Sequence, residues 1–141
     1  MQTTIPKIIV TVANLKTWNA IICGGKTAIV FDESGLTSAA NAPLWLDSNQ
    51  PGQTPLALAA QLSYSLTKGH CFQDGNKRTA LVAGNEYLRG MNHKLLYLGK
   101  PEDYAKDGAM LQVALKALTS VAQGEMTKEE LAEVYEKLAN K

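Results

Sequence analysis

The chain has few cysteines and no long apolar run. Its 141 residues include two cysteines, Cys23 and Cys71, too few for a disulfide framework. We therefore expect a reducing, cytoplasmic environment. No stretch approaches the roughly 18 consecutive apolar residues of a membrane span, and the first residues lack the regions of a signal peptide. These absences predict a protein without membrane contact.

An excess of charge of one sign is also missing. The chain has 14 basic and 13 acidic residues, which gives a formal net charge of +1. This balance offers no general reason to bind nucleic acid directly, although it is compatible with a local cationic site. Hydrophobic residues make up 45% of the chain. Together with the length, this content predicts one domain over residues 1–141 with a sizeable core.

The N-terminal part of the chain predicts a helix followed by a short extended segment. Apolar residues recur at spacings of three and four over residues 5–22, which favours a helix, but the β-branched run at 8–12 keeps a strand possible. Residues 26–31 are β-prone and lie between glycine-containing turns, so we expect one strand or a small hairpin there. Residues 36–46 predict a short helix that breaks near Pro43.

Two further helices are predicted after a loop at residues 47–53. Thr54 and Pro55 supply a capping hydroxyl and a proline at the first helical position, a strong helix start. We expect this helix to end at Gly69. The next helix is expected from about Asn76 to Arg89, followed by a glycine.

The remaining pattern is also helical. Ala83 and Gly84 are small enough to admit a close helical neighbour, so we expect the helix that contains them to be central. Residues 101–118 predict one or two helices. The sequence at 127–130 is a capping box before a last amphipathic helix. These patterns predict a mostly α, single compact domain with a short β-hairpin or strand.

One short motif is misleading. Residues 24–27, Gly-Gly-Lys-Thr, resemble the end of a phosphate-binding P-loop. The full pattern needs a glycine five residues before Gly25, where this chain has Ala20, and a buried strand leading into the loop. We therefore interpret residues 24–27 as a turn into the extended segment.

Residues 70–81, His-Cys-Phe-Gln-Asp-Gly-Asn-Lys-Arg-Thr-Ala-Leu, gather polar side chains at the start of a predicted helix. The first N–H groups of a helix have no intrahelical partner, and the helix dipole favours an anion there. Gly75 leaves room for a ligand and Asn76 adds an amide. Lys77 and Arg78 add cations that oppose the dipole. Since such cations do not favour the helix itself, they predict an external anion, for which phosphate is the usual choice.

Three neighbours complete this cluster. Asp74 is a candidate ligand for Mg²⁺, which proteins often hold through one or two carboxylates plus substrate phosphates. His70 is a candidate general base at neutral pH, and we expect Phe72 to be a buried anchor of the loop. Each of these residues also has a purely structural interpretation. Asp-Gly-Asn is a common turn, and a Lys-Arg pair is usually part of a solvated helix face. A histidine after a glycine is usually a surface or capping residue.

The cluster resembles the signature of the Fic/Doc superfamily, H-P-F-x-(D/E)-G-N-(G/K)-R, followed two residues later by arginine or an apolar residue. Six positions match: His70, Phe72, Asp74, Gly75, Asn76 and Arg78. Cys71 replaces the usual proline. Fic-type adenylyltransferases usually have glycine at the position of Lys77 and a second arginine at the position of Leu81. The sequence here is more similar to the Doc branch, the death-on-curing toxins, and the likeness covers roughly residues 15–125.

This resemblance implies a Fic/Doc-like helical domain and transfer of the γ-phosphate of ATP to a threonine of elongation factor Tu, which stops translation. His70 would accept the proton of the target hydroxyl, and Asp74 would bind Mg²⁺. The extended segment at 26–31 would be the flap that positions the target. The phosphates would be held around the start of the helix by Lys68, Gly75, Asn76, Lys77 and Arg78.

Regulation and two alternative functions are also predictions of the resemblance. Many Fic proteins carry an inhibitory helix in which a glutamate precedes glycine or asparagine, and no glutamate in this chain does so. We therefore expect inhibition in trans by an antitoxin whose disordered tail folds on binding. The alternatives to phosphate transfer are transfer of AMP and a catalytically silent domain that acts by binding a partner, for which Cys71 is the sequence hint.

Overall fold

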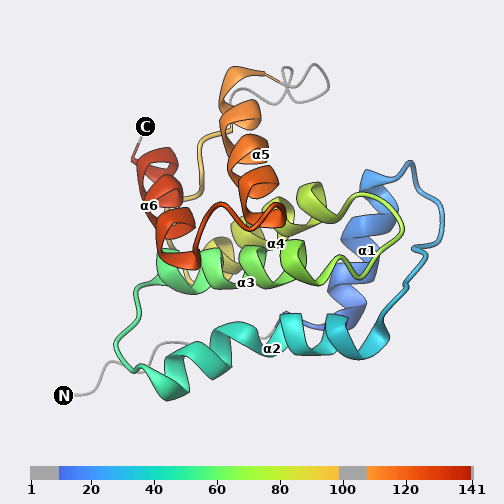
Figure 1. Ribbon diagram of the computed structural model, residues 1–141, viewed down its shortest axis with the longest axis horizontal. Helices are drawn as coiled ribbons and strands as arrows, with labels where there is room; N and C mark the ends of the chain where they lie inside the picture. Colours follow the sequence, from blue (N-terminus) through green and yellow to red (C-terminus); the bar gives the residue numbers. More distant parts are fainter. Residues whose placement is uncertain (1–9, 99–107, 141) are drawn as a thin grey trace.

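A computed structural model describes residues 10–98 and 108–140. This part of the chain is mostly helical, as the sequence predicts. Figure 1 shows the helices in chain order. Their bounds are α1 Val12–Ile22, α2 Glu33–Asn49, α3 Pro55–Gly69, α4 Asn76–Gly90, α5 Ala109–Ala122 and α6 Lys128–Ala139.

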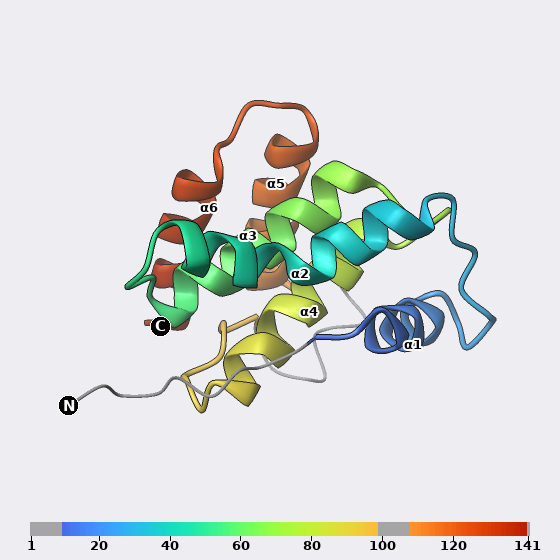
Figure 2. The same ribbon diagram turned by 90° about the horizontal axis from the view of Figure 1, so that it is seen from below.

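Helix α3 lies at the centre of the fold. It packs against α2, α4, α5 and α6, because Leu58, Leu62 and Leu66 recur every four residues and are all buried. Figure 2 shows α1 and α4 on one side of the layer formed by α2 and α3, with α5 and α6 on the other side. The prediction that α4 is central is thus only partly correct, since α3 has more helical neighbours.

The close approach of α3 and α4 depends on a glycine. Ser63 on α3 donates a hydrogen bond from Oγ to the carbonyl oxygen of Ala80 at 2.7 Å. A Cβ atom at Gly84 would lie 2.6 Å from the same Ser63 Oγ, which is closer than side chains pack. The expected close helical neighbour of α4 is therefore confirmed.

Helix α2 corrects one prediction. It runs without interruption from Glu33 to Asn49, with Pro43 inside it, so the helix neither breaks near Pro43 nor gives way to a loop at 47. A proline removes one backbone hydrogen bond, but Pro43 and Ala39 are buried where α2 packs against α3. Tertiary packing outweighs the local preference here.

The predicted strand or hairpin is not confirmed. Among the described residues, the extended segment forms a single antiparallel bridge, between Val30 and Phe72. Two hydrogen bonds flank it, from Phe31 N–H to the Cys71 carbonyl at 2.7 Å and from Gln73 N–H to the Ile29 carbonyl at 3.0 Å. The pairing cannot extend, because the partner loop lies between the end of α3 and the start of α4.

The N-terminal helix starts later than predicted. Thr11 caps α1 with a capping box to Asn14, and the helix begins at Val12. Residues 5–9 lie outside the described part of the chain. Gly24 and Gly25 have positive φ of 91° and 83° and form a turn. Because a helix and not a strand precedes this turn, the P-loop interpretation is excluded.

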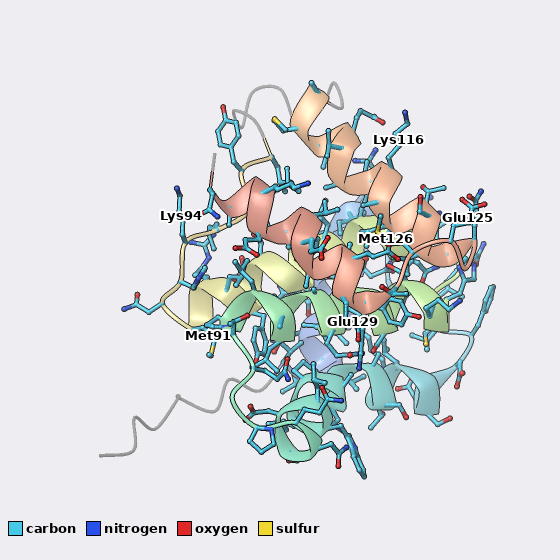
Figure 3. The ribbon with its side chains drawn as sticks, turned by 60° about the vertical axis from the view of Figure 1, so that its left-hand side comes forward. Met91, Lys94, Lys116, Glu125, Met126 and Glu129 are labelled. Atoms are coloured by element: carbon cyan, nitrogen blue, oxygen red, sulfur yellow. The ribbon has the colours of Figure 1, made fainter. Side chains whose placement is uncertain are left out.

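The C-terminal helices agree with the sequence patterns where they are described. Helix α5 begins at Ala109, and the earlier part of the predicted 101–118 helix lies outside the described residues. Figure 3 shows Met126 in the connection between α5 and α6, with Glu129 on the first turn of α6. The capping box at Thr127 is confirmed. Within residues 10–98 and 108–140, no helix is both long and apolar enough to cross a membrane.

Candidate functional site

His70 stands where α3 ends and the polar loop begins. It is the C-cap of α3, with φ 46° and ψ 50° in the left-handed region, and its N–H donates to the Leu66 carbonyl at 3.3 Å. The predicted end of the helix at Gly69 is confirmed, and the left-handed capping conformation falls on the next residue. A non-glycine residue in this conformation is strained by about 1–3 kcal/mol, and such strain occurs frequently at functional sites. The side chain of His70 is exposed.

The loop is braced from within by Asn76. The Phe72 N–H donates to Asn76 Oδ1 at 3.0 Å, and Asn76 Nδ2 donates to the Phe72 carbonyl at 2.8 Å. Asn76 and Phe72 are buried, at 8% and 1% exposed. Both ends of the Asn76 amide are therefore engaged by the loop, and the backbone N–H of Asn76 is the group that it can offer to an anion.

The Asn76 amide also determines which nitrogen of the neutral His70 ring carries the hydrogen. Asn76 Nδ2 lies 3.3 Å from His70 Nδ1. Because the Phe72 N–H identifies the other end of the amide as oxygen, the group facing the ring is the NH₂, which only donates. Nδ1 is then the acceptor, and the neutral imidazole carries its hydrogen on Nε2. At 3.3 Å this contact lies beyond the usual range for such a hydrogen bond, so it holds the ring weakly.

Gly75 is required by α1. Its φ is +74°, and a Cβ atom there would lie 3.0 Å from Cys23 Sγ and 3.2 Å from Asn19 Nδ2. The sequence argument assigned this glycine to the approach of a ligand. The structure shows that the space beside it is occupied by α1, so the absence of a side chain serves to bring α1 against the loop.

The N-terminus of α4 is electropositive and lacks a side-chain cap. Gly75 is the N-cap residue, no side chain accepts a hydrogen bond at this cap, and the first turn contains no acidic residue. The first turn instead contains Lys77, which is half-buried, and Arg78, which is exposed. The exposed carboxylate of Asp74 directly precedes the cap. The positive end of the dipole, N–H groups without a side-chain cap, and the two cations together favour an anion at this point.

These residues line one open hollow. Its volume is about 390 Å³, within the usual range for small-molecule sites. Helix α5 supplies the opposite wall through Leu115 and Thr119. The full lining is His70, Gln73, Asp74, Gly75, Asn76, Lys77, Arg78, Leu115 and Thr119.

Two predicted site residues lie outside this hollow. Lys68 is exposed on the last turn of α3 and is not part of the lining. Phe72 is buried in the core beneath the loop. The predicted contact of Lys68 with phosphate stays a prediction.

Cys71 packs beneath the loop. It is 1% exposed, and its Sγ atom would lie 3.1 Å from a Cβ added at either Gly35 or Gly69. Burial, and secondarily the charge of Asp32, raises the pKa of this thiol above its ordinary value. Cys71 therefore behaves as a small apolar residue, and its carbonyl accepts the hydrogen bond from Phe31 that attaches the extended segment.

Sequence reasoning missed three residues that shape the site. Leu115 and Thr119 form the α5 wall, and Asn19 on α1 donates to the Asp74 carbonyl at 2.7 Å. Asn19 lies on the apolar side of α1, one turn after the buried Leu15. A polar residue on an apolar helical face was the available signal for Asn19, whereas the α5 pattern gave none.

The site fits a magnesium ion carried by a nucleotide better than a metal held by protein alone. Among the described residues, no group of three or more His, Cys, Asp or Glu side chains is placed to bind a metal. Asp74 is the single carboxylate in the lining. One carboxylate with phosphate oxygens completing the shell is a common arrangement for Mg²⁺.

Comparison with known proteins agrees with this geometry. No curated protein matches the chain. The model of the Fic/DOC family matches residues 15–88, which extend from within α1 to the last turn of α4. Members of this family are typically transferases that act on proteins. Since the match covers more than half of the chain and includes the whole polar loop, the chain belongs to the Fic/DOC family.

Proposed function

We propose that this protein transfers the γ-phosphate of ATP to a hydroxyl group of a target protein. The observation that carries the proposal is the hollow at the start of α4, where a histidine, one carboxylate and two cations surround an uncapped helix N-terminus. Phosphoryl transfer depends mainly on positioning and charge stabilisation. The groups of this hollow supply both.

In the proposed reaction, the phosphates of ATP bind at the N–H groups of the first turn of α4, with Lys77 and Arg78 beside them. The ring of His70 turns away from Asn76 and accepts the proton of the target hydroxyl. The hydroxyl oxygen forms a bond to the γ-phosphorus, the bond to the bridging β–γ oxygen breaks, and ADP leaves. Asp74 would hold Mg²⁺, which neutralises the charge that develops on the phosphate oxygens.

Position 81 supports phosphate transfer over AMP transfer. Leu81 is 2% exposed. The resemblance described above puts an arginine at this position in adenylyltransferases. Leu81 lines a second hollow together with Val82 and Leu95, and Arg78 lines both this hollow and the one at the start of α4. No cation reaches the nucleotide from this position, while Lys77 adds one at the loop. We therefore infer that the γ-phosphate, and not the α-phosphate, is the group transferred.

The extended segment at 26–31 is the proposed contact for the target. Hydrogen bonds attach it to the loop that carries His70. The side chains of Ile29 and Phe31 are 55% and 65% exposed beside this attachment. Exposed apolar side chains attached to the loop that carries His70 are suited to bind a short target segment. A threonine of elongation factor Tu is the target that the family resemblance favours.

A partner in trans is the proposed inhibitor. The chain lacks the glutamate pattern of the inhibitory helix, so an antitoxin segment that folds over the hollow is the device expected to control it. We propose a cytoplasmic location for both partners.

The decisive experiment uses ATP labelled at one phosphate at a time. We expect purified protein and a cell lysate to give a labelled protein band with γ-labelled ATP and none with α-labelled ATP. His70→Ala is expected to lower the labelling rate by about 10²- to 10⁴-fold, the usual contribution of a general base. Label from the α-position alone would establish AMP transfer instead. No label from either position, with equal effects of wild type and His70→Ala on growth, would indicate a binding domain.

A further inference from the structure

Asn19 is a buried polar residue outside the polar loop. It lies on α1 and is 2% exposed. Its Nδ2 atom donates to the Asp74 carbonyl at 2.7 Å and to Thr79 Oγ1 at 3.1 Å. Burying an amide costs free energy unless the amide is hydrogen-bonded. Both N–H hydrogens of the Asn19 amide are donated, one to the polar loop and one to α4. Asn19 thus joins α1 to the loop and to the first full turn of α4.

The bond to the Asp74 carbonyl sets the direction of the next N–H. The peptide between Asp74 and Gly75 is planar and trans, so its C=O and N–H point in opposite directions. Since the C=O points to Asn19 on the α1 side, the Gly75 N–H points away from α1. Gly75 lines the hollow, and its N–H has no acceptor among the described residues.

Gly75 makes this arrangement possible. A Cβ atom at position 75 would lie 3.2 Å from Asn19 Nδ2. A side chain there would therefore push the Asn19 amide away from the Asp74 carbonyl. The bond to Thr79 holds the same amide against α4, where the Thr79 N–H donates to the Gly75 carbonyl at 2.8 Å. The Asp74–Gly75 peptide is therefore held at its carbonyl by Asn19, and the next peptide is held at the Gly75 carbonyl by the Thr79 N–H.

We propose that Asn19 is a positioning residue that orients the Gly75 N–H toward a bound phosphate and holds the backbone of Asp74. The proposal rests on the proposed function, in that phosphate is taken to be the ligand of the hollow. The proposal assigns a role in phosphate binding to a residue of α1, which lies 55 positions from Asp74 in the chain. Asn19 itself touches neither the phosphate nor the target.

The test compares Asn19→Leu with Leu15→Ala. Leucine has the branched shape of asparagine, with methyl groups in place of the amide, and no donor. Leu15 is a buried residue one turn earlier on α1 whose side chain forms no hydrogen bond to the loop. Binding of pyrophosphate is measured by calorimetry, and the Gly75 amide is followed by NMR with and without pyrophosphate. Transfer of γ-label gives kcat and KM for ATP.

We expect Asn19→Leu to weaken pyrophosphate binding by about 10- to 100-fold, the usual loss for a hydrogen bond to a charged group. The Gly75 amide signal should shift in the free protein and no longer respond to pyrophosphate. Leu15→Ala should lower thermal stability but keep wild-type affinity. Asn19→Ala should behave like Asn19→Leu, and it replaces that variant if leucine prevents folding.

The two proposals fail in different ways. If the wild type binds pyrophosphate but transfers no label, the proposed function fails and the role of Asn19 is still decided by binding and NMR. If both Asn19 variants bind pyrophosphate as tightly as Leu15→Ala and leave the Gly75 signal unchanged, Asn19 is structural only. A wild type that binds no pyrophosphate also overturns the positioning role.

Discussion

The N-terminus of α6 and the N-terminus of α4 are built from different residue types. At α6, Thr127 Oγ1 accepts from the Glu130 N–H and Glu130 Oε1 accepts from the Thr127 N–H, both at 3.1 Å. Glu129 and Glu130 place negative charge in the first turn. This helix satisfies its own donors and complements its own dipole.

The start of α4 has none of these features among the described residues. Its N-cap is Gly75, no side chain caps it, and the first turn holds two cations and no acid. A glycine in place of a capping side chain costs only a few tenths of a kcal/mol, and an unfavourable charge in the first turn typically costs about 0.3–1 kcal/mol. Helix α4 is held instead by its packing on α3 and α1. The comparison teaches that α6 caps its own donors, while α4 leaves its first turn without a side-chain cap, as the proposed anion site requires.

The largest expected effect contrasts two glycines with the same backbone. Gly75 and Gly124 have φ of +74° and +76°, but a Cβ atom meets Cys23 and Asn19 at position 75 and nothing within 4 Å at position 124. Gly124→Ala should cost about 1–3 kcal/mol for the left-handed conformation alone. Gly75→Ala should add about 1–3 kcal/mol for overpacking. Urea unfolding of both variants measures the difference.

The same pair of variants separates stability from binding. Gly75→Ala is expected to lose pyrophosphate binding, because α1 must move to admit the new methyl group, while Gly124→Ala binds as the wild type does. Equal losses of stability in the two variants would mean that α1 does not press on the loop at Gly75, and the contrast between the two helix starts would then reduce to their charges.

Much of the fold followed from local chemistry. The start at Thr54 and Pro55, the small residue at Gly84 and the capping box at Thr127 each act within a few residues or on one neighbouring helix. The errors occurred where distant contacts decide. Packing on α3 carries α2 through Pro43, and the extended segment forms a single bridge because its partner, Phe72, lies in a short loop.

The candidate site divides in the same way. His70, Asp74 and the first turn of α4 lie in one contiguous stretch, so their motif revealed them together. Asn19, Leu115 and Thr119 come from other helices, and which helix covers the loop depends on the whole arrangement of the core. Even within the motif, the pattern did not show that the Asn76 side chain is used to brace Phe72.

Removing the cap of α6 should have a smaller effect, on stability alone. Thr127→Ala loses the acceptor for the Glu130 N–H and is expected to lower the free energy of unfolding by about 1 kcal/mol. Transfer and pyrophosphate binding should be unchanged, since neither Thr127 nor Glu130 lines the hollow. Thermal unfolding and calorimetry check both parts. A loss of binding in Thr127→Ala would show that the α6 start also supports the site.

The smallest effect tests the opposite charges directly, by neutralising one residue in each first turn. Lys77→Gln removes a cation that opposes the dipole of α4, so it should raise the free energy of unfolding by about 0.3–1 kcal/mol. Glu129→Gln removes an acid that favours the dipole of α6 and should lower it by a similar amount. Glu129 is exposed on the first turn of α6 (Figure 3).

Salt and ligand binding make these small changes interpretable. Both stability changes should shrink in 1 M salt, and more so for the exposed Glu129 than for the half-buried Lys77, because screening weakens the interaction of a solvated charge with a dipole. Only Lys77→Gln should weaken pyrophosphate binding, since Lys77 lines the hollow. If Lys77→Gln is more stable than the wild type but binds pyrophosphate more weakly, Lys77 serves anion binding and lowers the stability of α4. If Lys77→Gln destabilises the protein at low salt, the lysine serves the fold, and the anion site must rest on the backbone of α4 and on Arg78.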